Sequence, residues 1–220
     1  MEKGIYLHSV GYLPGHYYYD PENQEIILKR ILDSGALLSL RRQGQIRNNG
    51  FNGPDLISLC DYDRRFEYND RRTKYNGYNQ YVIESLSIVF DKEEVKKEVD
   101  IIVPKLVCKI PSNVDGFIKM NNLGKSGDYY SDLPDEVFVE DRLSLNGMTF
   151  LTFPTKVFKS LYFFKSKSKK IQLIKDEINR LKEILDKREY DIGIYDIETF
   201  DELTDENIER LVLKRWQNSN

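Results

Sequence analysis

A short apolar strand that carries a histidine and leads into a well-capped helix is the feature that most constrains this fold. The strand is Ile5-Tyr6-Leu7-His8-Ser9. The helix after it begins at Asp20, which can accept hydrogen bonds from the first main-chain amides, and Pro21, which fits the first turn. Its apolar residues recur at helical spacing up to Gly35, where we expect it to end. Residues 36–40 then predict a second short strand, so the chain opens by alternating sheet and helix.

Further apolar runs bounded by turn residues predict the rest of a sheet. Strands are predicted at residues 55–60, 81–90, 99–103, 106–108, 136–139 and 149–153. Polar segments at residues 41–54, 61–80 and 111–134 are typical of loops. Because each strand is short and separately bounded, we expect an α+β fold with a mixed, mostly antiparallel split sheet and flanking helices.

After Pro154 the pattern changes from strands to helices. Apolar residues that step by three and four predict a long one-sided amphipathic helix: Ile171, Ile174, Ile178, Leu181 and Leu185. A short strand at 192–195 and a last helix at 205–216 follow. We therefore expect an α+β domain at residues 1–154 and a C-terminal helical extension at residues 155–220, packed on the same domain.

Composition excludes several classes of protein. The chain has 220 residues, a formal net charge of −3 and 40% hydrophobic residues, which disfavours a uniformly basic nucleic-acid binder and allows a buried core. No apolar run approaches the ~18 residues of a membrane-spanning helix, and no signal peptide is recognisable. Cys60 and Cys108 are most simply reduced, buried residues. We expect a cytoplasmic protein, in the producing cell or in a cell into which it is delivered.

Several kinds of catalytic site lack their defining residues. Two histidines, His8 and His16, and two distant cysteines make no metal-ligand spacing. The glycine fingerprints of dinucleotide-binding and phosphate-binding loops and the nucleophile elbow of a serine hydrolase are also absent. What remains is His8 on the first strand, Ser58 on a central strand and Glu136 at the head of a late strand.

In these residues the chain resembles the ADP-ribosyltransferase superfamily, which includes the diphtheria-toxin and poly-ADP-ribose polymerase group and the RNA 2′-phosphotransferases. The resemblance spans roughly residues 4–153. It is carried by Tyr6-Leu7-His8, Ile31 through Leu38, Leu56-Ile57-Ser58-Leu59 and Asp135-Glu136-Val137-Phe138-Val139. The chain departs from the family in having Ser9 directly after His8 and in lacking a Glu-x-Glu pair, so arginine is not supported as the acceptor.

The resemblance implies NAD as a substrate and a role for each site residue. His8 and Ser58 would hold the nicotinamide ribose, and Glu136 would be the catalytic carboxylate. A tyrosine would stack on nicotinamide; we assign this role to Tyr81, and the alternatives are Tyr62, Tyr75 and Tyr78. Arg41, Arg42 and Arg47 have the charge to reach the pyrophosphate.

The sequence thus predicts an enzyme that cleaves the nicotinamide–ribose bond and transfers ADP-ribose to an unknown protein, nucleic-acid or small-molecule acceptor, as toxins, effectors and defence factors do. The alternative is a non-enzymatic protein- or RNA-binding module with a degenerate version of the fold. It would bind through the tyrosine- and arginine-rich loop at residues 61–80 and through the C-terminal helix. In that case His8 is a core-edge histidine bonded to a main-chain carbonyl, and Glu136 is a solvent-facing strand residue.

Overall fold

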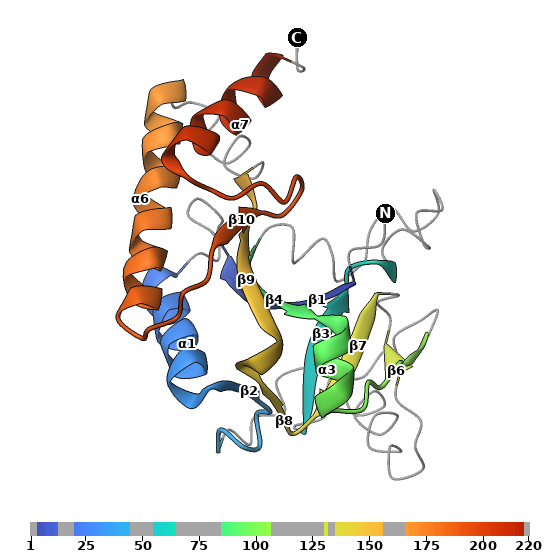
Figure 1. Ribbon diagram of the computed structural model, residues 1–220. Coiled ribbons are helices and arrows are strands. Elements are labelled where there is room, and N and C mark those ends of the chain that lie inside the picture. Colours follow the sequence, from blue (N-terminus) through green and yellow to red (C-terminus); the bar gives the residue numbers. More distant parts are fainter. Residues whose placement is uncertain are drawn as a thin grey trace, which may run out of the picture. The chain divides into compact units, whose positions relative to one another are not determined.

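The chain forms two compact units that interleave along the sequence. We describe it from a computed structural model, over residues 4–12, 20–44, 55–64, 85–106, 130–131, 135–155 and 166–217. The first unit comprises Met1–His8, Ser34–Val82 and Phe90–Met148, and the second comprises Ser9–Asp33, Ile83–Val89 and Thr149–Asn220. The mostly antiparallel strands and flanking helices confirm the α+β class predicted from the sequence (Figure 1).

Strand β3 (Leu56–Asp61) is the centre of the first unit. It pairs antiparallel with β7 (Glu136–Glu140), in a register that sets Ser58 opposite Phe138 and Cys60 opposite Glu136. On its other edge it pairs antiparallel with β1 (Ile5–Tyr12), where Leu7 lies opposite Cys60. Most side chains of β3 and β7 are apolar and buried, as the continuous apolar runs of these segments predict.

Shorter elements complete the first unit. Strand β2 (Ala36–Leu38) pairs antiparallel with β8 (Arg142–Ser144), and β5 (Lys105–Leu106) pairs parallel with β6 (Tyr130–Ser131). Helix α3 (Lys92–Glu98) begins after Asp91, whose side chain accepts hydrogen bonds from two main-chain amides of the first turn. The 3₁₀ helix η3 (Leu145–Gly147) follows β8.

The strand predicted at residues 99–103 is wrong. In the described part of this stretch only Ile102 bridges another strand, through reciprocal main-chain hydrogen bonds of 2.9 Å with Phe138. Val99 instead ends α3 as its C-cap. Pro104 has no N–H group with which to extend a ladder. The apolar run therefore yields one isolated bridge.

The strands of the second unit follow the order β10-β9-β4-β1. Strand β10 (Ile194–Asp196) pairs parallel with β9 (Met148–Phe153), and β4 (Ser85–Asp91) lies next to β9. The Thr152 hydroxyl lies 3.5 Å from the main-chain oxygen of Ser87, to which it donates across this pair. Strands β1, β4 and β9 contribute residues to both units.

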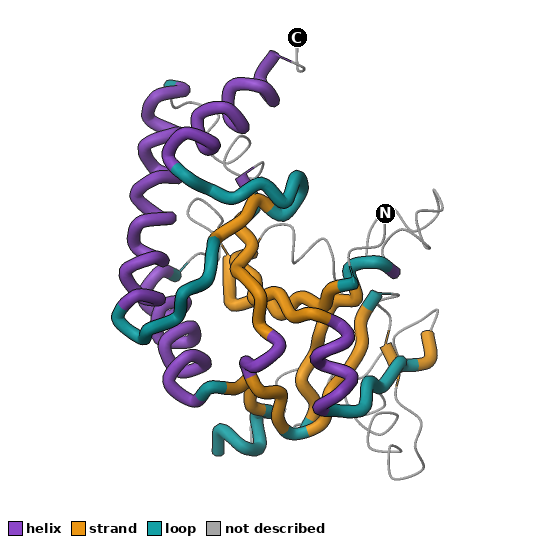
Figure 2. Tube along the Cα trace, viewed as in Figure 1, coloured by secondary structure: helices purple, strands orange, loops and turns teal. Residues whose placement is uncertain are grey.

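Three helices of the second unit confirm the helices predicted from the sequence: α1 (Pro21–Ser34), α6 (Lys167–Asp186) and α7 (Asp205–Gln217). Figure 2 shows these long helices in purple, and in Figure 1 α7 lies beside α6. Gly35 follows α1 with a φ of 62°, the left-handed conformation that ends a helix at glycine. No helix within the described residues is both long enough and apolar enough to cross a lipid bilayer.

Polar contacts join α6 to α1. The guanidinium of Arg180 donates to Gln24 Oε1 over 2.7 Å and to Glu177 over 2.6 Å, and Gln24 in turn donates to the main-chain oxygen of Tyr12 over 2.9 Å. Arg188 donates to Asp33, at the end of α1, over 2.6 Å. The helix predicted as an extension is thus tied to the first helix of the chain.

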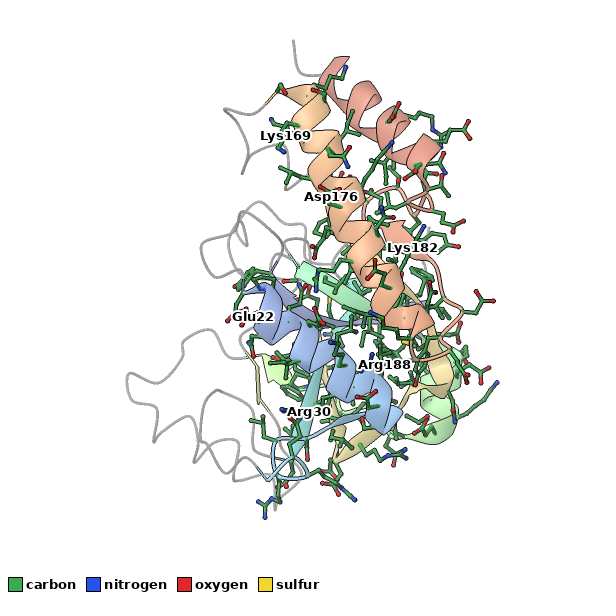
Figure 3. The ribbon with its side chains drawn as sticks, turned by 90° about the vertical axis from the view of Figure 1, so that its left-hand side faces the viewer. Glu22, Arg30, Lys169, Asp176, Lys182 and Arg188 are labelled. Atoms are coloured by element: carbon green, nitrogen blue, oxygen red, sulfur yellow. The ribbon has the colours of Figure 1, made fainter. Side chains whose placement is uncertain are left out.

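Figure 3 shows α1 and α6 from a side on which labelled charged side chains of both helices lie. The labelled side chains Glu22 and Arg30 of α1 and Lys169, Asp176 and Lys182 of α6 are exposed. The opposite face of α6 buries four of the five apolar residues that predicted it: Ile174, Ile178, Leu181 and Leu185. This division is the amphipathic pattern expected from their spacing.

Asp196 of β10 is fully buried and holds the turn that follows its strand. One carboxylate oxygen accepts the main-chain N–H groups of Glu198 (3.0 Å) and Thr199 (2.9 Å). The other accepts the main-chain N–H (3.3 Å) and the hydroxyl of Thr155. A single side chain therefore satisfies donors from two separate segments of the second unit.

We expect Asp196→Ala to lower the free energy of unfolding by about 3 kcal/mol, because it leaves several of these donors without an acceptor. Asp191→Ala removes an exposed aspartate five residues earlier and should cost less than about 0.5 kcal/mol. Urea unfolding of both variants measures the difference. Equal losses of stability would contradict the assigned role of Asp196.

Candidate active site

Ser58 is placed so that its main-chain oxygen and its hydroxyl contact different strands. At the two ends of the β3–β7 pair, Asp61 donates its N–H to the Asp135 carbonyl and Asp141 donates to the Asp55 carbonyl, each over 2.7 Å. Odd-numbered residues of β3 therefore bond to β7, and the main-chain groups of Ser58 and Cys60 turn toward β1.

His8 lies one residue past Leu7, the last residue of β1 that is paired with β3. Its Nδ1 is 3.0 Å from the main-chain oxygen of Ser58. Because a carbonyl oxygen only accepts hydrogen bonds, Nδ1 carries the hydrogen, which we infer from this contact. The bond is the one expected of a core-edge histidine, and it also fixes which ring nitrogen faces any ligand.

Burial of the imidazole lowers the pKa of His8 below its ordinary value of 6.5, although the hydrogen bond to Ser58 acts in the opposite direction. The ring is therefore neutral at neutral pH. With the hydrogen on Nδ1, the second ring nitrogen, Nε2, is an acceptor. A neutral histidine in this state can receive a hydrogen bond from a sugar hydroxyl or an amide.

Glu136 is 6% exposed, which excludes the solvent-facing alternative. The hydroxyl of Ser58 donates a hydrogen bond to its Oε1 atom. The register explains the contact, because Cys60 lies opposite Glu136 and Ser58 is two residues further along the same face of β3. The two residues are 78 positions apart in the sequence.

The two contacts reach Ser58 from different directions. Leu7, Cys60 and Glu136 are paired across three strands, so their side chains share one face of the sheet. The pairing of β1 with β3 ends at Leu7, and the next residue, His8, contacts Ser58 through its side chain. The His8 ring meets the Ser58 carbonyl oxygen, which lies in the plane of the sheet. Each of the two residues is thus held by Ser58, one at its carbonyl and one at its hydroxyl.

The other residues predicted for the site lie elsewhere or outside the described residues. Tyr81, Tyr75 and Tyr78 are outside the described residues. Tyr62 is described, and at 2% exposed it is a core side chain. Two of the three predicted arginines form ion pairs at the end of β3 and β7 that is distant from Glu136: Arg41 with Asp55, and Arg42 with Asp141. Arg47 is not among the described residues.

One buried polar residue beside the site, Asp135, was given no role in the sequence analysis. Asp135 is 1% exposed, and its Oδ2 atom is 3.6 Å from the Sγ atom of Cys60, whose thiol is buried as expected. The acidic residues near it in the sequence favour an exposed position. Its place directly before an apolar strand could have predicted its burial. Among the described residues, no group of three or more histidine, cysteine, aspartate or glutamate side chains is placed to hold a metal ion.

Comparison with known proteins gives a sparse result. No protein-family model matches the sequence, and no curated protein matches it. The solved structure of DarT from Thermus sp. 2.9 in complex with NAD⁺ aligns with a TM-score of 0.34 and 11% identity, over 73% of this chain and 89% of that chain. The complex of Thermus sp. 2.9 DarT with carba-NAD⁺ aligns with a TM-score of 0.34 and 12% identity, over 80% of this chain and 91% of that chain. At these scores the likeness assigns no family, so the chemistry of the site is argued from its own residues.

The lowered pKa of His8 predicts how stability depends on pH. As the pH falls below 6.5, the unfolded chain takes up a proton at His8 more readily than the folded chain, so the free energy of unfolding declines. In His8→Gln this contribution, at most about 1.4 kcal/mol per pH unit, should be absent. Urea unfolding of both proteins between about pH 8 and pH 5 measures it. If the free energy of unfolding changed with pH in the same way in wild type and His8→Gln, then His8 is not desolvated in the folded chain.

Proposed function

We propose that this chain is an NAD-dependent ADP-ribosyltransferase, which cleaves the bond between nicotinamide and ribose and transfers ADP-ribose to an acceptor. The observation that carries the proposal is the hydrogen bond from the Ser58 hydroxyl to the buried carboxylate of Glu136. The main-chain oxygen of the same Ser58 is bonded to the His8 ring. These are the three residues for which the sequence resemblance implies contacts with the nicotinamide ribose.

Glu136 is suited to stabilise the charge that develops in this reaction. When the bond between ribose C1′ and the nicotinamide nitrogen breaks, the electron pair leaves with nicotinamide and the ribose becomes positive. A carboxylate bonded to the neighbouring 2′-hydroxyl stabilises that charge electrostatically. The acceptor then forms its bond to C1′ and releases its proton to solvent or to a nearby base.

Ser58 and His8 have supporting roles in this proposal. The hydroxyl of Ser58 donates to Oε1 of Glu136 and so limits the orientations of the carboxylate before substrate binds. The neutral ring of His8 offers Nε2 as an acceptor for a ribose hydroxyl or the nicotinamide amide. Tyr81 stays a prediction as the aromatic residue that stacks on nicotinamide.

The biological role that we propose is that of a toxin, effector or defence factor, with a protein or nucleic-acid acceptor. The proposed setting is the cytoplasm, where a buried thiol such as that of Cys60 stays reduced. A non-enzymatic binding module is the competing function, and the response to a change at Glu136 separates the two.

In Glu136→Gln we expect the release of nicotinamide from NAD to fall about 10³-fold, because the amide is neutral and no longer stabilises the ribose charge. The Kd for NAD should change only a few-fold. Nicotinamide release followed by chromatography, with NAD binding followed by calorimetry, measures both quantities.

Glu140→Gln is the matched control, because Glu140 lies on the same strand and is exposed. It should keep wild-type turnover. A folded wild-type protein that neither binds NAD nor releases nicotinamide would refute the proposed function. Equal turnover in wild type and Glu136→Gln would remove Glu136 from the reaction.

Ser58→Ala tests the orientation of the carboxylate. Loss of a hydrogen bond to a charged group should lower kcat for nicotinamide release by about 10- to 100-fold, with a smaller change in KM. Ser58→Thr keeps a hydroxyl and should recover most of the loss. A fall in Ser58→Thr as large as that in Ser58→Ala would assign Ser58 to packing.

A further inference from the structure

A buried cluster of charged side chains lies at the ends of β1 and β3, close to the candidate active site. The ammonium group of Lys92 donates to Asp61 over 2.5 Å and to Asp63 over 2.7 Å. The side chain of Lys92 is 13% exposed, and those of Asp61 and Asp63 are 11% and 13% exposed. The same ammonium lies 5.2 Å from the centre of the Tyr6 ring, within cation–π range.

Main-chain hydrogen bonds close the cluster around Gly4. The N–H of Gly4 donates to Asp63 over 3.0 Å, and its carbonyl accepts the N–H of Lys92 over 2.9 Å. Lys92 is the first residue of α3, so one residue holds the start of β1, the end of β3 and the start of a helix. Gly4 has a φ of 63°, which favours glycine at this point.

The charges of the cluster are set by its own members. Burial acts to lower the pKa of Lys92, but hydrogen bonds to Asp61 and Asp63 and their negative charges outweigh it and raise the pKa above 10.5. Lys92 is therefore a cation at neutral pH. Burial, with the charge of Asp61, raises the pKa of Tyr6 above 10.0, so the phenol is neutral.

The pairing of β1 with β3 needs such an anchor because it is short. Tyr6 lies opposite Asp61, and both belong to the cluster; Leu7 lies opposite Cys60. The next residue of β1 is His8, which contacts Ser58. A slip of one residue would turn the side chains of one strand to opposite faces and move the His8 ring away from this carbonyl.

We infer that Lys92 is a positioning residue, which sets the register of β1 against β3 and thereby the place where the His8 ring meets Ser58. Its importance for catalysis rests on the proposed function. A slip of β1 would pull Tyr6 and Gly4 away from Asp61 and Asp63, and Lys92 opposes it through two ion pairs and one main-chain hydrogen bond.

The experiment reads the register at His8 without substrate. The chain has two histidines, so a His16→Gln background leaves the His8 ring as one set of proton resonances to titrate by NMR. In Lys92→Met the His8 ring should become more exposed to solvent, and its pKa should rise toward its ordinary value of 6.5. Lys92→Arg keeps the charge and should titrate more nearly as wild type does.

The matched control is Lys96→Met, one turn later on α3, where the side chain is 50% exposed and pairs with Glu93. It should leave the His8 titration unchanged. An unchanged His8 titration in folded Lys92→Met would overturn the inference, and so would an equal shift in Lys96→Met.

A second variant covers the case in which Lys92→Met does not fold. Lys92→Gln with Asp63→Asn removes both ion pairs, while Asp61 keeps its hydrogen bonds from the main-chain amides of Asp63 and Arg64. The folded double variant should show the same upward shift at His8, and an unchanged titration contradicts the inference. If neither variant folds, the cluster determines the whole fold and not one register, and the inference is wrong.

The outcome is separable from that of the proposed function. The titration uses no NAD, so it can succeed in a protein that turns out to be catalytically inactive. If the wild type is active, Lys92→Met should raise KM for NAD by about tenfold and change kcat less, since binding suffers more than the chemistry. Active wild type with an unmoved His8 titration leaves the proposed function standing and removes Lys92 from it.

Discussion

The candidate site depends on one constraint, the register of β3 between its two neighbours. Leu59, Val137 and Val139 are at most 1% exposed, and burying each such side chain contributes roughly 1.5–3 kcal/mol. A slip of one residue between β3 and β7 would exchange these buried faces for polar ones such as Glu140. The apolar residues therefore maintain the register, and the hydrogen bond of Ser58 to Glu136 follows from it.

Burying a carboxylate in this part of the sheet costs free energy. The groups that bond to each buried carboxylate show how that cost is offset. Moving an ionised carboxylate out of water costs far more free energy than burying an apolar side chain contributes, unless the carboxylate is hydrogen-bonded or ion-paired. Here Glu136 accepts from Ser58, Asp135 accepts from the Cys60 thiol, and Asp61 pairs with Lys92. The Lys92 cluster has a structural task that accounts for its burial. For Glu136 we propose a chemical role, because buried carboxylates gather at functional sites.

Local patterns predicted the elements that are long or capped, and missed those defined by distant partners. The spacing of apolar residues and the caps at Asp20 and Ser166 are local signals, so α1 and α6 were predictable. Strands β6 and β8 have two and three residues, which is too few to show a period. Residues 99–103 have the apolar pattern of a strand, but they form a single isolated bridge. Ser58 and Glu136 were predicted by resemblance to a family, because no local pattern reports a contact across 78 residues.

The protonation state of His8 is consistent with the reaction proposed for this site. In NAD the nicotinamide ring is cationic while attached to ribose, and it leaves as a neutral molecule, so the leaving group needs no proton from an acid. A charged imidazole close to the ribose would oppose the positive charge that develops there. Burial keeps His8 neutral and so removes that repulsion, while Nδ1 stays bonded to Ser58. The negative charge of one carboxylate is then the main electrostatic contribution that the proposed reaction needs from the site, and we propose that the buried Glu136 supplies it.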